Sequence, residues 1–263
     1  MAKATLTKRI EFSASHRYHN PAWDAERNRQ VFGACNYEHG HGHNYLLEVT
    51  LKGEVDAVTG MILNLYDLKQ ILTEFLEEFD HKHLNLDTPY FRDRIPTTEN
   101  FALVLWERLA SRPETRHLDR LRLYESEVLF AEVTDPSSCS GSSAPSSSNL
   151  HVTIGRRYSL ADGIIAGSRQ HAGWPFTLEV LIHGPIDTAT GQIVNLTHLD
   201  QAVQRQLGHI ASEDQYPRSV LFPLQDVELL RTMWTALSTP FPGLSQLSLH
   251  DLQGTILSYH GDR

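Results

Sequence analysis

The chain has 263 residues, of which 40% are hydrophobic and 21% charged; this composition is typical of a globular protein and excludes a disordered one. The formal net charge of −9 argues against a nucleic-acid-binding protein, which would carry a basic surface. Two cysteines make no disulfide framework, which favours a reducing compartment. Because we find neither a signal-peptide pattern nor a run of about 20 apolar residues, we expect a cytoplasmic protein that does not cross a membrane.

A serine-rich segment, PSSCSGSSAPSSSN, occupies residues 136–149. Chains rich in Ser, Gly and Pro bury little apolar surface and form flexible linkers. We therefore predict one domain over residues 1–135 and a second over residues 150–263. Cys139 lies in this linker, and we assign it no function.

The two halves resemble each other in sequence. LEVTLKGEVDAVTGMILNLYDL at residues 47–68 matches LEVLIHGPIDTATGQIVNLTHL at residues 178–199, without gaps and at a constant offset of 131. The identical positions include Glu48 and Glu179, Gly53 and Gly184, Asp56 and Asp187, Gly60 and Gly191, and Asn64 and Asn195. A match of this length indicates an internal duplication, so we call the halves the first and second repeat.

Each repeat is predicted to run strand, strand, helix, helix, strand, strand. In the first repeat, apolar residues alternate over 47–51, which predicts a half-buried strand, and a turn at 56–60 leads into a short apolar strand. Apolar residues at helical spacing over 65–79 predict a helix. A second helix begins after Pro96, with Thr97 or Thr98 as its cap, and strands follow over about 118–134. The fold class is therefore α+β, with an antiparallel four-stranded sheet and two helices on one face in each repeat.

The segment CNYEHGHGHNY, residues 35–45, carries candidate metal ligands. Residues two apart on a strand point to the same side, so His41 and His43 should project together. His16, at the end of the first predicted strand, could supply a third imidazole. Catalytic zinc sites use three protein ligands and keep one position open, and the glycines on either side of His41 would allow a close backbone approach. We therefore predict a zinc site.

Three further residues are candidates for proton transfer. Cys35 is six residues before His41; it is either an inert buried thiol or a thiolate whose pKa is lowered by nearby positive charge. Asp80 and His81 should close the first helix, where the carboxylate could orient the imidazole. Such pairs are also common at helix ends without any catalytic role.

Seven motifs together resemble one known family. They are FSASHR, CNYEHGHGHNY, GEVDAVTGMILNLYDLK, FDHKHLN, PYFRD, PTTEN and LYES. Their order and spacing, over about residues 10–130, are similar to those of the 6-pyruvoyl-tetrahydropterin synthases. The five residues between Cys35 and His41 also match this family, whereas 6-carboxytetrahydropterin synthases typically have a shorter gap. The resemblance implies the tunnelling fold, in which domains assemble into a closed barrel with sites at their interfaces.

The resemblance also implies roles for individual residues. The zinc ligands would be His16, His41 and His43. The proton-transfer groups would be Cys35, Asp80 and His81. Glu125, in LYES, would clamp the pterin ring, because adjacent N–H donors of the ring suit a carboxylate. Residues lining the pocket would be Thr97, Thr98 and Glu99, although for the threonines a plain helix cap is an equal alternative.

The implied activity is that of a zinc-dependent lyase that converts 7,8-dihydroneopterin triphosphate to 6-pyruvoyl-tetrahydropterin and releases triphosphate. Candidate triphosphate ligands, each of which could instead make a surface salt bridge, are Arg17, Arg27, Arg29 and Lys82. One alternative is another enzyme of the same fold, which makes 6-carboxytetrahydropterin or cleaves a dihydropterin side chain. The other alternative is a non-enzymatic pterin-binding or assembly protein.

The second repeat should lack zinc chemistry. At the offset of 131, Ala172 and Trp174 stand opposite the two histidines of the HGH segment, and Asp162 stands where His16 should be. Asp251 stands opposite Glu125 and could still hold a ring. We therefore expect a degenerate repeat that serves as a scaffold in a homo-oligomer, with a trimer of tandem chains favoured. Stacked rings of like repeats and barrels of mixed repeats both remain open.

Overall fold

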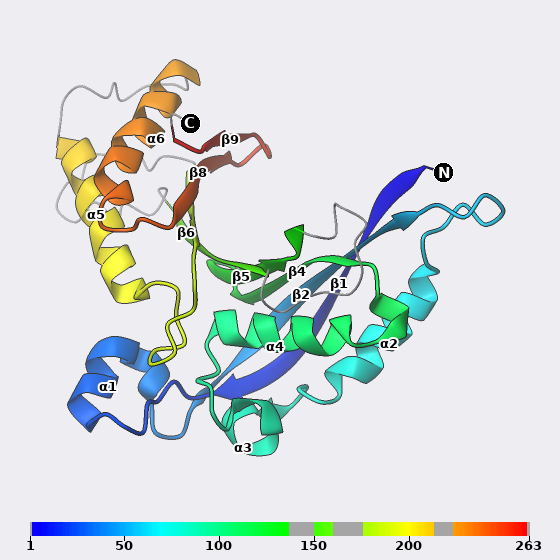
Figure 1. Cartoon of the computed structure of the whole chain (residues 1–263). Helices are drawn as coiled ribbons and strands as arrows, with labels where there is room; N and C mark the ends of the chain where they lie inside the picture. The colour runs from blue at the N-terminus through cyan, green and yellow to red at the C-terminus, as the bar shows by residue number, and fades with distance from the viewer. Residues whose placement is uncertain (1, 137–149, 160–175, 213–222, 262–263) are drawn as a thin grey trace. The chain divides into compact units, whose positions relative to one another are not determined.

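The computed structural model describes residues 2–136, 150–159, 176–212 and 223–261 (Figure 1). Two compact units form: unit 1 contains Met1–Ile154 and Gly184–Ile193, and unit 2 contains Gly155–His183 and Val194–Arg263. Several positions discussed from the sequence lie outside the described residues: 137–149 with Cys139, Asp162, Ala172 and Trp174. Among the described residues, no helix has the length and hydropathy needed to cross a bilayer.

Unit 1 contains an antiparallel sheet with one short parallel strand at its edge. The long strands are β1 (Lys3–His16), β2 (His41–Glu54), β4 (Leu118–Ser126) and β5 (Leu129–Thr134), and the short one is β3 (Lys82–His83). Their order is β3-β1-β2-β4-β5, and only β3 runs parallel to its neighbour. The α+β class is confirmed, whereas the prediction of four strands missed β3.

The helices of unit 1 are α1 (Ala25–Phe32), α2 (Leu65–Leu76), α3 (Leu84–Asp87) and α4 (Thr98–Ala110). Short 3₁₀ helices lie at Gly33–Asn36, Pro89–Phe91 and Pro113–Thr115. Thr97 caps α4 by accepting a hydrogen bond from Asn100 N, as the sequence predicted. The short strand expected after the 56–60 turn does not form, because Asn64 caps α2 and the chain enters this helix at once.

The helices α2 and α4 pack on the sheet and close the core of unit 1 (Figure 1). The apolar face predicted for β2 is buried at Leu47, Val49 and Leu51. The strand is not half-buried as predicted, however, because Glu48 and Thr50 on the other face are buried as well, where they contact Arg9 and Thr7 of β1. On α4, the ring of Phe101 contacts the rings of Phe12 and Tyr45. The apolar core therefore continues along the same sheet face to Tyr45, two residues from the HGH segment.

Unit 2 contains the helices α5 (Leu196–Ser212) and α6 (Pro223–Ser238). Its strands are the part of β6 (His151–Ser159) from Gly155 on, followed in order by β7 (Phe176–His183), β8 (Leu244–Asp251) and β9 (Ile256–Tyr259). The pairing of β2 with β4 shifts register between Thr50 and Leu51, and that of β7 with β8 shifts between Leu181 and Ile182. These irregularities lie 131 residues apart, which is the offset of the sequence repeat.

Strand register also locates the counterpart of Glu125. Leu123 pairs with Leu47, and Leu249 pairs with Leu178, so Asp251 has the register position of Glu125. The Oδ1 of Asp251, however, accepts the N–H groups of Gln253 and Thr255 and shapes the turn before β9. One oxygen of this carboxylate thus has local structural partners, whereas both hydrogen bonds to Glu125 come from residues far away in the chain.

The two compact units differ from the two predicted domains, which were divided at residues 136–149. The segment Gly184–Ile193 belongs to the second repeat by sequence but to unit 1 by contacts. The physical reason is a set of hydrogen bonds between this segment and the start of α4. No local pattern in the sequence predicts such a contact.

Removing the Phe101 ring should destabilise unit 1 strongly. Phe101 has no exposed surface, and Phe101→Ala should cost about 3–5 kcal/mol of unfolding free energy through lost burial and a cavity. Leu86→Ala is the control, since Leu86 is 78% exposed and should cost less than about 0.5 kcal/mol. Denaturant unfolding would measure both, and equal effects would contradict the described core.

Candidate active site

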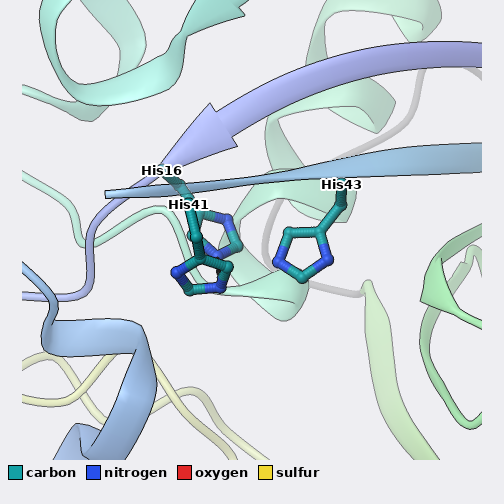
Figure 2. Close-up of side chains that lie close together, drawn as sticks. All are labelled: His16, His41 and His43. Carbon is teal, nitrogen blue, oxygen red and sulfur yellow. Dashed lines mark hydrogen bonds between the residues drawn. The ribbon is translucent and has the colours of Figure 1, made fainter. Parts of the chain in front are cut away.

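Three histidine side chains converge at one end of the sheet of unit 1 (Figure 2). His16 is the last residue of β1 and pairs with His41, the first residue of β2. His43 lies two residues further along β2, on the same face. One nitrogen from each of the three rings lies within 4.8 Å of the others, and His16 Nε2 is 3.2 Å from His41 Nε2. This cluster could hold a metal ion.

Burial favours the neutral form of two of these imidazoles, those of His16 and His41. Burial, followed by the nearby His43 and His41, lowers the pKa of His16 from 6.5 to about 2. Burial also lowers the pKa of His41. Neutral imidazole is the form that binds metals. In addition, His41 Nδ1 and His43 Nε2 are buried without a hydrogen-bond partner among the described residues, so a three-nitrogen donor set fits a zinc ion.

Tyr45 orients the most buried of the three histidines. Its hydroxyl lies 2.9 Å from His16 Nδ1, which leaves Nε2 facing His41, and its ring stacks on Phe12. Burial raises the pKa of Tyr45 well above its usual value, so the phenol stays protonated. The sequence analysis assigned Tyr45 no role at the site, although its place two residues after His43 put it on the ligand face.

Glu125 lies beside the cluster near the end of β4. Its Oε2 accepts hydrogen bonds from the hydroxyl of Tyr18 at 2.9 Å and from that of Thr98 at 2.6 Å. Its Oε1 is 3.5 Å from His43 Nε2. One carboxylate oxygen is therefore anchored and the other faces the histidines. Tyr18 was missed by the sequence analysis, although it continues the alternation of Ala14 and His16.

Glu99 forms a second buried carboxyl group, in the first turn of α4. Burial raises its pKa from 4.5 to about 7, although backbone hydrogen bonds, including the one from Ile193, oppose this rise. The bond from Ile193 N to Glu99 Oε1 is 3.0 Å long. Next to it, Thr97 donates to the carbonyl of Gly191 at 2.5 Å. Thr97 is therefore a helix cap that also makes a long-range contact.

Cys35 lies in the 3₁₀ turn Gly33–Asn36 and is partly buried. It packs against a small cluster of Tyr18, Phe32 and Ile95, and its carbonyl accepts the N–H of Tyr18. The Tyr18 ring lies 4.6 Å from that of His16 between centroids. Cys35 is thus held in the wall that flanks the histidine cluster.

Asp80 and His81 pair with each other in the turn that follows α2. Because α2 ends at Leu76, they lie in the turn beyond it and not at the helix end that the sequence predicted. Asp80 Oδ2 is 2.9 Å from His81 Nδ1, and Asp80 Oδ1 accepts the N–H of Ser13. Burial opposes ionisation of Asp80, but the hydrogen bonds from Ser13 and His81 lower its pKa on balance. His81 is 81% exposed, and the described contacts tie the pair to β1 rather than to Cys35.

Of the two glycines around His41, only one is required by the structure. A Cβ on Gly40, which has φ +70°, would meet His16 O at 2.7 Å and His83 Nε2 at 2.9 Å. A Cβ on Gly42 would make only ordinary contacts, at 3.6 Å and beyond. Gly40 therefore allows the close approach of its backbone to that of His16, as expected. His83, which the sequence analysis missed, also lies next to Gly40.

Tyr45→Phe tests the orientation of His16. The variant keeps the ring packing but removes the hydroxyl next to Nδ1, and loss of such a supporting partner typically lowers metal affinity roughly 10–100-fold. Competition with a coloured chelator would measure the zinc affinity. Tyr66→Phe, at an exposed tyrosine of α2, should leave it unchanged. An unaltered affinity in Tyr45→Phe would show that the hydroxyl does not support a ligand.

Comparison with known proteins places this site in a family. The sequence profile of 6-pyruvoyl tetrahydropterin synthase matches residues 5–136, which is half of the chain. The chain is 43% identical to 6-pyruvoyl tetrahydrobiopterin synthase of Homo sapiens over 126 residues, covering 48% of this chain and 87% of that protein. It is 31% identical over 134 residues to the dihydroneopterin monophosphate aldolase of Pyrococcus furiosus, covering 50% of this chain and 97% of that protein.

Among solved structures, the chain aligns with 6-pyruvoyl tetrahydropterin synthase of Caenorhabditis elegans at 35% identity and a TM-score of 0.47, over 48% of this chain and 91% of that one. The matched profile spans the three histidines of the cluster, the buried carboxyl groups of Glu99 and Glu125, and Cys35. By the sequence profile and the match to the human protein, the chain belongs to the 6-pyruvoyl tetrahydropterin synthase family.

Proposed function

We propose that unit 1 is a zinc-dependent lyase that converts 7,8-dihydroneopterin triphosphate to 6-pyruvoyl-tetrahydropterin and releases triphosphate. The observation that carries this proposal is the group of three converging imidazoles next to a buried, anchored carboxylate, Glu125. His16, His41 and His43 would hold the zinc ion, which when bound supplies Lewis-acid chemistry for the side-chain hydroxyls of the substrate.

The protein groups around the cluster would bind the ring. Glu125 and Glu99 offer carboxyl oxygens to the adjacent N–H donors of a pterin, an arrangement that gives strong charge-assisted hydrogen bonds. Thr97 and Thr98 hold the start of α4, and Thr98 also anchors Glu125. The ring would therefore be fixed before the side chain reacts, which places the reacting carbon next to the histidines.

Cys35, Asp80 and His81 would move the protons. Cys35 flanks the cluster through Tyr18, so we assign to its thiolate the removal of the proton from the side-chain carbon. His81 is exposed and would exchange protons with solvent, while Asp80 fixes its tautomer. Among the triphosphate candidates, Arg17 directly follows His16, and its Nε is buried without a partner among the described residues.

The second repeat would be a non-catalytic copy, and the whole chain would assemble as a trimer. The shared register shift at an offset of 131 supports the duplication. The engagement of Asp251 in its own turn supports loss of ring binding at that position. Three tandem chains would together provide six repeats, the number of domains in the assembly of this family.

Product analysis tests the reaction. Purified protein supplied with 7,8-dihydroneopterin triphosphate should yield the pyruvoyl product and free triphosphate, resolved by liquid chromatography and mass spectrometry. His41→Ala removes one of the three proposed ligands and should lower both the zinc content and turnover, because a catalytic zinc site needs three protein ligands. A carboxylated pterin with acetaldehyde, or a pterin that has lost its side chain, would instead favour the related activities. Pterin binding without turnover would favour a binding protein.

Cys35→Ala tests the carbon base separately from zinc binding. Loss of a general base typically lowers the rate by a factor of roughly 10²–10⁴, so kcat should fall by that range while zinc content and pterin affinity stay unchanged. Cys139→Ala is the matched control, because the sequence places this cysteine in the serine-rich segment, and it should behave as wild type. Full turnover in Cys35→Ala would remove this residue from the mechanism.

A further inference from the structure

The chain contains the same turn twice, once in each repeat. Asp56 Oδ1 accepts hydrogen bonds from the N–H groups of Val58 and Thr59 and from the Thr59 hydroxyl. Asp187 Oδ1 accepts the same three bonds, from Ala189 and Thr190. Each turn ends in a glycine of positive φ: Gly60 at +70° and Gly191 at +73°. The two turns therefore have the same local hydrogen bonds and the same backbone conformation at their glycine.

Their surroundings within unit 1 differ sharply. The first turn is open to solvent, with Val58 94% exposed and Met61 49% exposed. A Cβ on Gly60 would meet nothing within 4 Å, whereas one on Gly191 would meet Asn100 Nδ2 at 2.8 Å and Thr97 Cγ2 at 3.0 Å. The second turn is thus packed against the start of α4.

The second turn and the residue that follows it form hydrogen bonds with two of the proposed ring-binding residues, Thr97 and Glu99. Thr97 donates to the carbonyl of Gly191 at 2.5 Å, and the N–H of Ile193 donates to Glu99 Oε1 at 3.0 Å. A third bond joins Asn20 Nδ2 to the carbonyl of Ala189 at 2.8 Å. Residues 191 and 193 of the second repeat are therefore hydrogen-bonded to the first residues of α4 and its cap, including Glu99.

Gln192 is the residue that distinguishes the second turn. It takes the place of Met61 in the first repeat and is only 6% exposed. Its side-chain carbonyl, Oε1, is buried without a hydrogen-bond partner among the described residues. Buried amide oxygens rarely stay unpaired in a native protein, because a ligand or a water molecule usually supplies the donor.

We propose that the turn Asp187–Gln192 completes the ring-binding pocket of unit 1, with the Gln192 side-chain carbonyl accepting a hydrogen bond from an N–H group of the bound heterocycle. The identity of that heterocycle, a pterin, rests on the function proposed above. The proposal gives the second repeat a direct task. It supplies one wall of a site whose metal ligands lie in the first repeat.

Reciprocal exchange of the residues that follow the two glycines tests the role of Gln192. Gln192→Met removes the acceptor and should raise both the KM for 7,8-dihydroneopterin triphosphate and the Kd for neopterin about tenfold, as expected for one hydrogen bond. Its kcat should stay within about twofold, because the group contacts the ring and not the reacting carbon. Met61→Gln, in the exposed turn, should leave KM and Kd within about twofold of wild type.

Alanine at the two glycines tests the packing of the turn. Gly191→Ala and Gly60→Ala force the same left-handed backbone on a residue with a Cβ, but only Gly191→Ala meets Thr97 and Asn100. We expect Gly191→Ala to raise the Kd for neopterin at least about tenfold, and Gly60→Ala to raise it less than twofold. Zinc content, which depends on residues outside the turn, should remain at the wild-type level in all four variants.

The outcomes separate the two proposals. If wild-type protein does not turn over the triphosphate, the proposed reaction fails, while the neopterin measurements still test the pocket. If wild-type protein is active and Gln192→Met keeps a wild-type KM and Kd, the role of Gln192 is wrong. Equal effects of Gly191→Ala and Gly60→Ala would show that the packed turn contributes no more than the exposed one.

Discussion

The active site depends on the register in which β1 pairs with β2. His16 stands opposite His41, so one short pairing at the end of two strands brings the imidazoles together. Side chains alternate between faces along a strand, and a slip of one residue would move both histidines of β2 to the other side of the sheet. The register is held by the apolar residues of the same face, Leu47, Val49 and Leu51, which are all buried in the core. The same alternation of side chains along β2 therefore places both the apolar core and the histidines of the site.

Burial at this end of the sheet creates complementary chemistry. It lowers the pKa values of His16 and His41 and raises the pKa of Glu99 to about 7, while Glu125 is held by the hydroxyls of Tyr18 and Thr98. Buried polar groups are costly unless they are paired. The structure pairs most of them but leaves His41 Nδ1 and His43 Nε2 without a hydrogen bond among the described residues, with Glu125 Oε1 3.5 Å from His43 Nε2. Unpaired lone pairs next to anchored carboxylates are what a site for a cation and an N–H-rich ring requires.

The duplicated turns show how one local structure can serve two purposes. Their hydrogen bonds are the same, but the first is exposed and the second lies against Thr97 and Glu99. The second repeat has a local turn partner for Asp251 in place of a free carboxylate, yet it keeps the segment that unit 1 incorporates. A segment of one repeat can thus belong, by its contacts, to the compact unit built around the other repeat.

The sequence by itself determined the features that depend on local periodicity. Alternation over β2 predicted its buried face and the convergence of His41 and His43, and the residues after Pro96 predicted the cap of α4. The offset of 131 revealed the duplication without any structure. Tertiary structure alone decided which groups complete the site: the Tyr45 hydroxyl at His16, Tyr18 and Thr98 at Glu125, and the Gly191 segment at Thr97. These partners lie 27 to 107 residues apart in the chain. No periodic pattern links such positions, because their contact arises only when the sheet and α4 have packed together.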